Sequence, residues 1–169
     1  MAGAVRLEPV DERNLEALLS VAAAEAEPGD VMPPVEAPVG WSHARREAFR
    51  DYHRASFAGL DGPTRTRMYA ILAGGEVVGM VRMSRCDEPG VVETGMWLGR
   101  SARGQGLGVA ALRELLNEAA AAGMHAVLAE TTRDNAGAVQ VLRKCGAKLL
   151  EDGDVVRAEI CLDATPPVL

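Results

Sequence analysis

The stretch Arg100-Ser-Ala-Arg-Gly-Gln-Gly-Leu-Gly108 decides the fold. Its three glycines stand at alternate positions, directly before an amphipathic helix that the pattern predicts over residues 107–121. Glycine removes the Cβ atom where a backbone must approach a ligand closely, and the helix adds unpaired N–H groups at the positive end of its dipole. The segment therefore predicts a phosphate-binding loop, to which Arg103 contributes a formal charge. A tight strand-to-helix turn without a ligand is the alternative.

Two other phosphate-binding motifs compete for this stretch. Gly106-x-Gly108-x-x-Ala111 also matches the dinucleotide fingerprint, with Glu130 at about the distance of the ribose-binding acid. A dinucleotide fold, however, opens with this unit and repeats it, whereas here the unit begins past residue 90 and one further helix follows. A nucleoside-triphosphate loop is excluded because no Lys-Ser/Thr pair follows the glycines.

The order of elements on both sides of the loop supports this choice. Alternating or short apolar runs and turn residues predict a meander before the loop and one strand–helix–strand–strand unit after it. Gly74-Gly75 forms a hairpin turn, and the proline-rich segment 31–41 is an irregular loop of a kind that is often functional. We expect one domain, residues 1–169, with strands at 5–10, 67–73, 77–84, 91–98, 125–130, 147–150 and 155–162, and helices at 12–27, 42–57, 107–121 and 135–146.

Composition narrows the function classes. The net charge of −6 over 169 residues argues against nucleic acid, which needs clustered cations. No apolar run is long enough for a signal peptide or a membrane span, so we expect a cytoplasmic protein with no membrane partner. The three cysteines are odd in number and widely spaced, which indicates buried reduced thiols and no metal site.

Two motifs together resemble the GNAT superfamily of N-acetyltransferases. The family's pyrophosphate motif, Arg/Gln-x-x-Gly-x-Gly/Ala, is matched by Arg103-Gly-Gln-Gly106-Leu-Gly108. Its later segment, an asparagine that opens a helix ending in Lys-x-Gly, is matched by Asn135 and by Lys144-Cys-Gly146. The likeness is strong over residues 91–146, and the order of strands and helices extends it to nearly the whole chain.

The resemblance implies an α/β (α+β) fold: a mixed, twisted, mostly antiparallel sheet of six to seven strands with about four helices. Its fourth and fifth strands would splay apart and hold acetyl-coenzyme A between them, with no metal. The backbone N–H of Leu98 would polarise the thioester carbonyl as an oxyanion donor. The implied cofactor-binding residues are Met96, Trp97, Leu98, Arg103, Gly104, Gln105, Gly106, Leu107, Gly108, Val109 and Asn135, the last of which has helix capping as its alternative role.

The resemblance also implies direct attack by an amine, which needs a base to remove its proton. Glu93 is similar to the glutamate that many members place on this strand, and Glu93-Thr-Gly-Met-Trp97 is similar to the Glu-x-Gly-x-Trp of the branch that acetylates ribosomal proteins. Many relatives carry an acidic tyrosine in the last helix, where this sequence has Leu142, so the general acid is unassigned. A solvated or ion-paired glutamate is the alternative reading of Glu93.

The acceptor amine is expected to bind near the first two helices and the loop that joins them. Trp41, Tyr52, His53 and Glu93 are the candidate substrate-binding residues, with Glu25, Glu27, Asp30 and Glu36 supplying negative charge. The segment before Trp41 is similar to acetyltransferases that inactivate aminoglycosides, the kasugamycin 2′-amino type among them. Acetylation of a protein N-terminal or lysine amine, and a non-catalytic acyl-coenzyme A sensor, are the alternatives, in a monomer or a homodimer.

Overall fold

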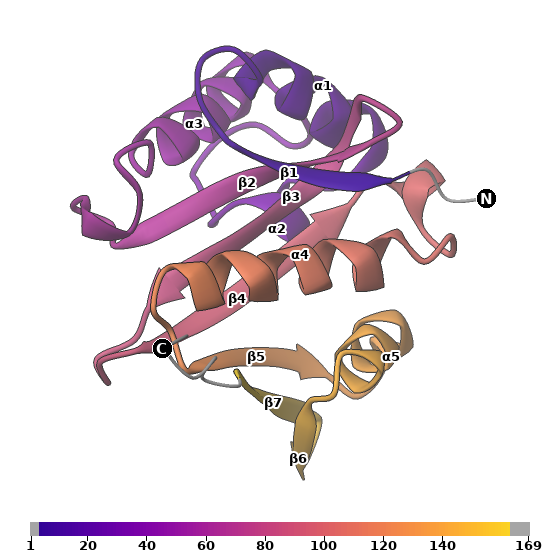
Figure 1. Cartoon of the computed structure of the whole chain (residues 1–169). Coiled ribbons are helices and arrows are strands. Elements are labelled where there is room, and N and C mark those ends of the chain that lie inside the picture. The colour runs from indigo at the N-terminus through magenta and orange to yellow at the C-terminus, as the bar shows by residue number, and fades with distance from the viewer. Residues whose placement is uncertain (1–3, 163–169) are drawn as a thin grey trace.

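A computed structural model describes residues 4–162, so both ends of the predicted 1–169 domain lie outside the described residues. It contains one seven-stranded sheet in the order β1-β2-β3-β4-β5-β7-β6, mostly antiparallel and with β4 parallel to β5 (Figure 1). The strands are β1 Val5–Pro9, β2 Thr66–Ala73, β3 Glu76–Arg85, β4 Val91–Leu98, β5 Ala126–Thr132, β6 Lys148–Asp152 and β7 Val155–Cys161. The helices are α1 Leu15–Glu25, α2 Pro28–Val31, α3 His43–Arg54, α4 Leu107–Ala121 and α5 Ala136–Lys144, with 3-10 turns at Gly59–Asp61 and Arg100–Ala102.

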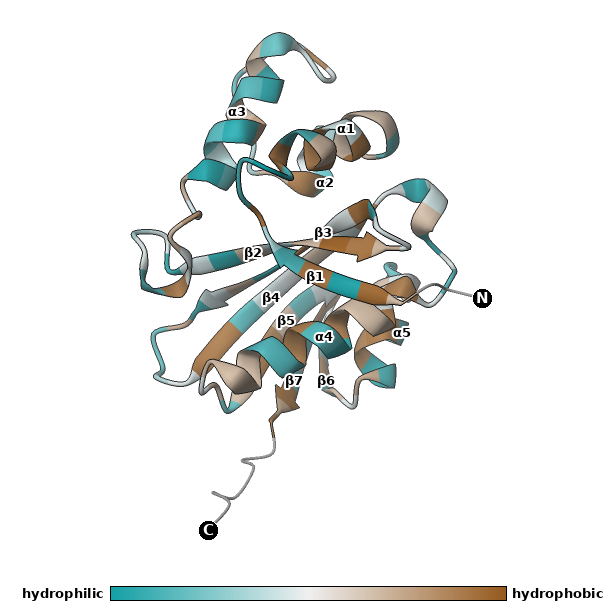
Figure 2. Ribbon diagram, turned by 45° about the horizontal axis from the view of Figure 1, so that its top comes forward, coloured by the Kyte–Doolittle hydropathy of each residue, from teal (hydrophilic) through white to brown (hydrophobic). Residues whose placement is uncertain are grey.

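Helices cover the two faces of the sheet separately. Successive side chains on a strand point to opposite faces, so Tyr69 and Ile71 join a core with α4 and α5, while Met68 and Ala70 join a second core with α1, α2 and α3. In Figure 1, α4 and α5 accordingly lie on one side of the sheet and α1 and α3 on the other. In Figure 2, α3 is mostly hydrophilic, which agrees with its two buried residues, Phe49 and His53.

The middle of the sheet opens between β4 and β5. These strands pair in register over Val91, Val92 and Glu93 only, against Ala126, Val127 and Leu128. Beyond Glu93, β4 continues to Leu98 beside β3, and β5 continues to Thr132 beside β7. This divergence confirms the predicted splay between the fourth and fifth strands.

Boundaries differ from the prediction mainly in the first half. The first helix ends at Glu25 and not near residue 27, because Pro28 begins a separate four-residue helix, α2, that no periodicity indicated. With this short helix, the described residues contain five α-helices, where about four were expected. Gly74 and Gly75, at φ 60° and 84°, make the predicted hairpin turn. Within residues 4–162 no helix has both the length and the apolar character to cross a membrane.

Candidate active site

The glycine loop presents unpaired N–H groups at the start of α4. Gly104 and Gly106 have φ of 74° and 78°, a region that favours glycine, and Gly106 is the N-cap of the helix. The first hydrogen bond at this end runs from the Ala110 N–H to the Gly106 carbonyl. The N–H groups of Leu107, Gly108 and Val109 therefore have no acceptor within the helix. A Cβ atom at Gly104 or Gly106 would have no neighbour within 4 Å, so the surface above both glycines is open.

Three side chains hold this loop in place. Glu25, at the end of α1, accepts a hydrogen bond from the Ser101 N–H at 3.1 Å. The Gln105 side chain donates to the Ser101 carbonyl at 2.7 Å, and Nε of Arg103 donates to the Leu98 carbonyl at 3.1 Å. The last contact places the Arg103 guanidinium at the end of β4, beside the splay. Glu25, which is also expected to lie near the acceptor, thus supports the loop.

The peptide groups of β4 alternate between β3 and the splay. Gly99 donates to Val78 and Cys86 donates to Val91, at opposite ends of the β3–β4 pair. Since alternate residues on a strand direct their peptide groups to the same side, the odd-numbered residues of β4 face β3. The N–H and C=O groups of Thr94, Met96 and Leu98 then face the space where β5 has diverged. Trp97 faces β3 with its backbone and the α1 core with its side chain.

The second motif forms the wall of the site next to α4. Oδ1 of Asn135 accepts a hydrogen bond from the Ala138 N–H at 3.1 Å and so caps α5. A Cβ atom at Gly108 would lie 3.1 Å from Cγ2 of Val141, so this glycine also lets α4 and α5 approach closely. Leu142 is buried in the core, and no acid replaces the family's tyrosine at this position.

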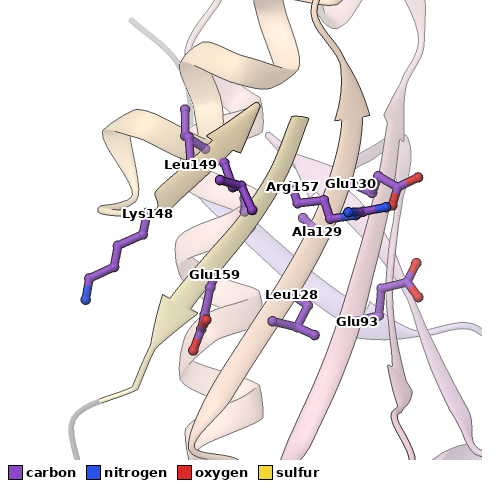
Figure 3. A pocket seen from close by; sticks show the side chains of 10 residues that line it. Glu93, Leu128, Ala129, Glu130, Lys148, Leu149, Arg157 and Glu159 are labelled. Atoms are coloured by element: carbon purple, nitrogen blue, oxygen red, sulfur yellow. The ribbon is translucent and has the colours of Figure 1, made fainter. Parts of the chain in front are cut away.

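Glu93 lies at the rim of an open cavity on the face of the sheet opposite α4 (Figure 3). The cavity measures about 630 Å³ and extends over β5, β7 and β6. Three carboxylates and two cations line it together with apolar residues: Glu93, Glu130, Glu159, Lys148, Arg157, Leu128, Ala129, Leu149, Leu150 and Ala158. Arg157 is paired with Glu130 at 3.4 Å. The charge of the cavity is therefore mixed.

Glu93 also connects this cavity to a smaller one under α3. Oε1 of Glu93 lies 3.6 Å from an Nη atom of Arg82, and Ser84 is the cross-strand partner of Glu93. Arg82 and Ser84 both line the second cavity, which measures about 190 Å³ and also contacts Tyr52. Sequence reasoning missed Arg82, although aligning β3 with β4 across the turn at residues 86–90 would have placed it beside the glutamate.

The other predicted substrate-binding residues, Trp41, Tyr52 and His53, have different surroundings. Tyr52 lines the smaller cavity. Trp41 donates from Nε1 to the Ala26 carbonyl at 2.9 Å and packs edge-on against Phe49, so it holds the 31–41 loop on α1. His53 has no exposed surface, and its Nδ1 lies 2.7 Å from the Phe49 carbonyl. A side chain enclosed in this way does not line an open site, so the prediction for His53 is corrected to a core position.

No group of three or more His, Cys, Asp or Glu side chains in residues 4–162 is arranged to hold a metal ion. Cys86 and Cys145 are partly buried and Cys161 is exposed, and all three are unpaired thiols.

Comparison with known proteins places the fold. Residues 31–147 match the acetyltransferase (GNAT) family. The structure is similar to RimJ of Mycobacterium smegmatis in complex with CoA-disulfide, at 22% identity and a TM-score of 0.76 over 97% of this chain and 85% of that one. It is also similar to RimL, a ribosomal L7/L12 alpha-N-protein acetyltransferase in complex with coenzyme A, at 21% identity and a TM-score of 0.75 over 95% and 96%. Mutant forms of the spermidine/spermine N-acetyltransferase SpeG of Vibrio cholerae match at 13% identity and a TM-score of 0.67 over 94% of each chain. No curated protein matches this sequence.

Proposed function

This chain belongs to the acetyltransferase (GNAT) family, and from that premise we propose that it transfers an acetyl group from acetyl-CoA to a primary amine by direct attack. The observation that carries the proposal is the position of Glu93. It is the last β4 residue that pairs with β5, opposite Leu128, so its carboxylate stands where the splay opens and lines the larger cavity, which we assign to the acceptor. We place the enzyme in the cytoplasm, with residues 1–169 acting as one domain.

The residues around the splay fit acetyl-CoA. A long ligand with phosphates at one end and a reactive thioester at the other needs an anion site and an extended channel. The unpaired N–H groups of Leu107, Gly108 and Val109 lie under open surface beside Gly106 and suit the diphosphate. The free peptide groups of Thr94 and Met96 and the N–H of Leu98 suit the amide-bearing pantetheine arm. The Trp97 backbone and side chain both face elsewhere, so we leave this residue out of the binding site.

The proton of the attacking amine and the negative charge on the thioester oxygen each have a candidate partner in this site. The Glu93 carboxylate accepts the proton of the attacking amine, either directly or through one water. The Leu98 N–H, directed into the splay, stabilises the negative charge that develops on the thioester oxygen. Leu142 cannot protonate the departing thiolate, so this proton comes from solvent or from the acceptor.

Two acceptor classes are supported by different observations. Glu93, Glu130 and Glu159 favour a small cation such as an aminoglycoside or a polyamine, and SpeG, similar in fold, is a spermidine/spermine acetyltransferase. The open cavity and its balancing Lys148 and Arg157 favour the N-terminal amine of a peptide, and RimL, also similar in fold, acetylates a ribosomal protein.

Release of free thiol from acetyl-CoA in the presence of amines tests the proposal. Purified protein is screened against aminoglycosides, polyamines and N-terminal peptides, with Glu93→Gln as the test variant and Glu76→Gln, at the exposed start of β3, as its matched control. Glu93→Gln is expected to lower kcat by about 10²-fold or more, the usual contribution of a general base, and to leave acetyl-CoA affinity unchanged. Thermal stabilisation by acetyl-CoA without thiol release on any amine would indicate a non-catalytic sensor instead.

A further inference from the structure

Hydroxyl groups line the smaller cavity beside Glu93. Its walls come from α3, the segment after it, β2 and β3, and its polar side chains are Tyr52, Ser56, Thr64, Thr66, Ser84 and Arg82. Ser84 pairs in register with Glu93. A group bound in this cavity would therefore lie next to the carboxylate that takes the amine proton.

The hydroxyl protons of Thr66 and Ser84 are directed away from Arg82. The Thr66 hydroxyl donates to the Thr64 carbonyl at 3.0 Å, so its single proton is used there. In its 2.7 Å contact with Ser84, the Thr66 oxygen is then the acceptor and Ser84 is the donor. The Ser84 oxygen in turn accepts from an Nη atom of Arg82 at 3.1 Å. These hydrogen bonds anchor one end of the Arg82 guanidinium to the Thr64 carbonyl through two hydroxyl groups.

The rest of the Arg82 guanidinium keeps free donors. Among the described residues, the bond to Ser84 is the one hydrogen bond that the Arg82 side chain makes. Its contact with Glu93, at 3.6 Å, is longer than a hydrogen bond. A Cβ atom on Gly95 would lie 3.0 Å from the nearer Nη atom, so the missing side chain of this glycine lets the guanidinium lie flat on β4. The side chain is 27% exposed. It is held in one place with N–H groups unused.

We propose that Arg82 and this cavity form an oxygen-binding subsite that selects acceptors with a carbonyl or carboxylate oxygen close to the reacting amine. A guanidinium with free donors binds such oxygens well. In an α-amino carbonyl compound, three bonds separate the nitrogen from the oxygen, a reach of about 3 Å. Because Oε1 of Glu93 and the Nη atom of Arg82 lie 3.6 Å apart, the nitrogen of one such unit can contact Glu93 while its oxygen contacts Arg82. The subsite rests on the proposed transfer reaction, and it favours amino acids and peptide N-termini over polyamines.

Three small amines of similar size test this selection: glycinamide with a carbonyl, glycine with a carboxylate, and propylamine with no oxygen. Each is assayed at pH 8 with the unmodified chain and with Arg82→Gln. The ratio of kcat/KM between the two proteins cancels the basicity of each amine. Arg82→Gln is expected to lower kcat/KM at least about tenfold more for the oxygen-bearing amine that binds the subsite than for propylamine, whose change reports the loss of the charge beside Glu93. Selection of glycinamide indicates a peptide N-terminus, and selection of glycine indicates a free amino acid.

The controls separate the subsite from folding and from the transfer reaction. Arg85→Gln, on the same strand and paired with exposed Asp61, should leave all three amines unchanged. Arg82→Lys keeps the charge without the fork and should recover part of the loss, and thermal stabilisation by acetyl-CoA reports whether each variant is folded. An equal loss on all three amines, or no loss on any, would overturn the subsite. If the unmodified chain releases no thiol with any amine, the proposed acetyl transfer, on which the subsite rests, would be overturned.

Discussion

Glu25 and Ser101 join the end of α1 to the turn that precedes the glycine loop, through a 3.1 Å hydrogen bond from the Ser101 N–H to the Glu25 carboxylate. A Cβ atom on Gly99 would lie 2.8 Å from the other oxygen of this carboxylate, so the contact is close on both sides. The Ser101 hydrogen bond, aided by the Arg100 charge, holds the pKa of Glu25 below its usual range. The hydrogen bond is therefore fully formed at pH values above the usual pKa range of a glutamate, and it is lost as the pH falls through the lowered pKa of Glu25.

Glu25→Gln is therefore expected to loosen the loop without reaching the reacting atoms. The KM for acetyl-CoA should rise several-fold, by about the contribution of one hydrogen bond to a charged group, while kcat changes little. Steady-state kinetics at neutral pH measure both constants. Glu27→Gln, an exposed residue that caps no helix with its side chain, is the matched control. A change in kcat with an unchanged KM would contradict this role.

Gly106→Ala and Gly123→Ala form a matched pair at the two ends of α4. Both glycines have positive φ, 78° and 85°, and a Cβ atom at either would have no neighbour within 4 Å. Both substitutions should lower the free energy of unfolding by about 1 kcal/mol, measured with urea. Only Gly106→Ala should also weaken acetyl-CoA binding, measured by calorimetry, because its methyl group occupies the surface assigned to the diphosphate. Equal binding of acetyl-CoA by the two variants would contradict the assignment of the diphosphate to this loop.

Asn135 has one established contact, the cap of α5, and one proposed contact with the coenzyme. Asn135→Ala should cost about 1 kcal/mol of unfolding free energy, whereas Asn135→Asp keeps an oxygen on the Ala138 N–H and should be near neutral. If Asn135 also donates its amide to the ligand, Asn135→Asp will raise the KM for acetyl-CoA while the stability is kept. An unchanged KM in the aspartate variant would reduce this residue to a cap.

His53 makes stability depend on pH. Burial lowers the pKa of His53 to about 4 from its ordinary value of 6.5, against the opposing contact with the Phe49 carbonyl. Between these values the unfolded chain binds a proton that the folded chain does not, so the free energy of unfolding falls as the pH falls. The loss is about 1.4 kcal/mol per pH unit, on the order of 3 kcal/mol in total. Urea denaturation from pH 7 to pH 4 should show this slope, superimposed on the effects of the carboxylates.

His53→Phe should flatten this component of the slope. The variant cannot take up the proton and keeps an aromatic ring in a site that also contains Phe49 and Tyr52. His43→Gln, at the exposed start of the same helix, should retain the full slope. A slope that persists unchanged in His53→Phe would assign the pH dependence to other groups.

The sequence predicted the elements whose cause is local. The short apolar runs of β2 and β3, the Gly74-Gly75 turn and the glycine loop before α4 each carry their own signal, and all were found. The ends of α1 and α3 were predicted too far along the chain, since Pro28 starts a new helix and α3 stops at Arg54. Apolar periodicity continues past such ends and cannot detect them.

The site was harder to predict where it depends on contacts distant in the chain. His53 and Tyr52 are neighbours on one helix, yet one is enclosed by Phe49 and the other lines a cavity, and no local pattern distinguishes them. Arg82 acquires its role from the register of β3 on β4. The spacing of Glu130 from the glycine loop suggests a ribose ligand and gives no sign of its ion pair with Arg157 across β5 and β7.

The short pairing of β4 with β5 leaves an unfinished edge in the centre of the sheet rather than at its rim. Proteins usually shield such edges, because unpaired peptide groups recruit other strands. Here the unpaired groups are the N–H and C=O of Thr94 and Met96 and the N–H of Leu98, with β5 diverging on their open side. A narrow partner with amides of its own can lie there as a substitute strand. In the proposed reaction acetyl-CoA takes this place, so each round of catalysis would close and reopen the sheet.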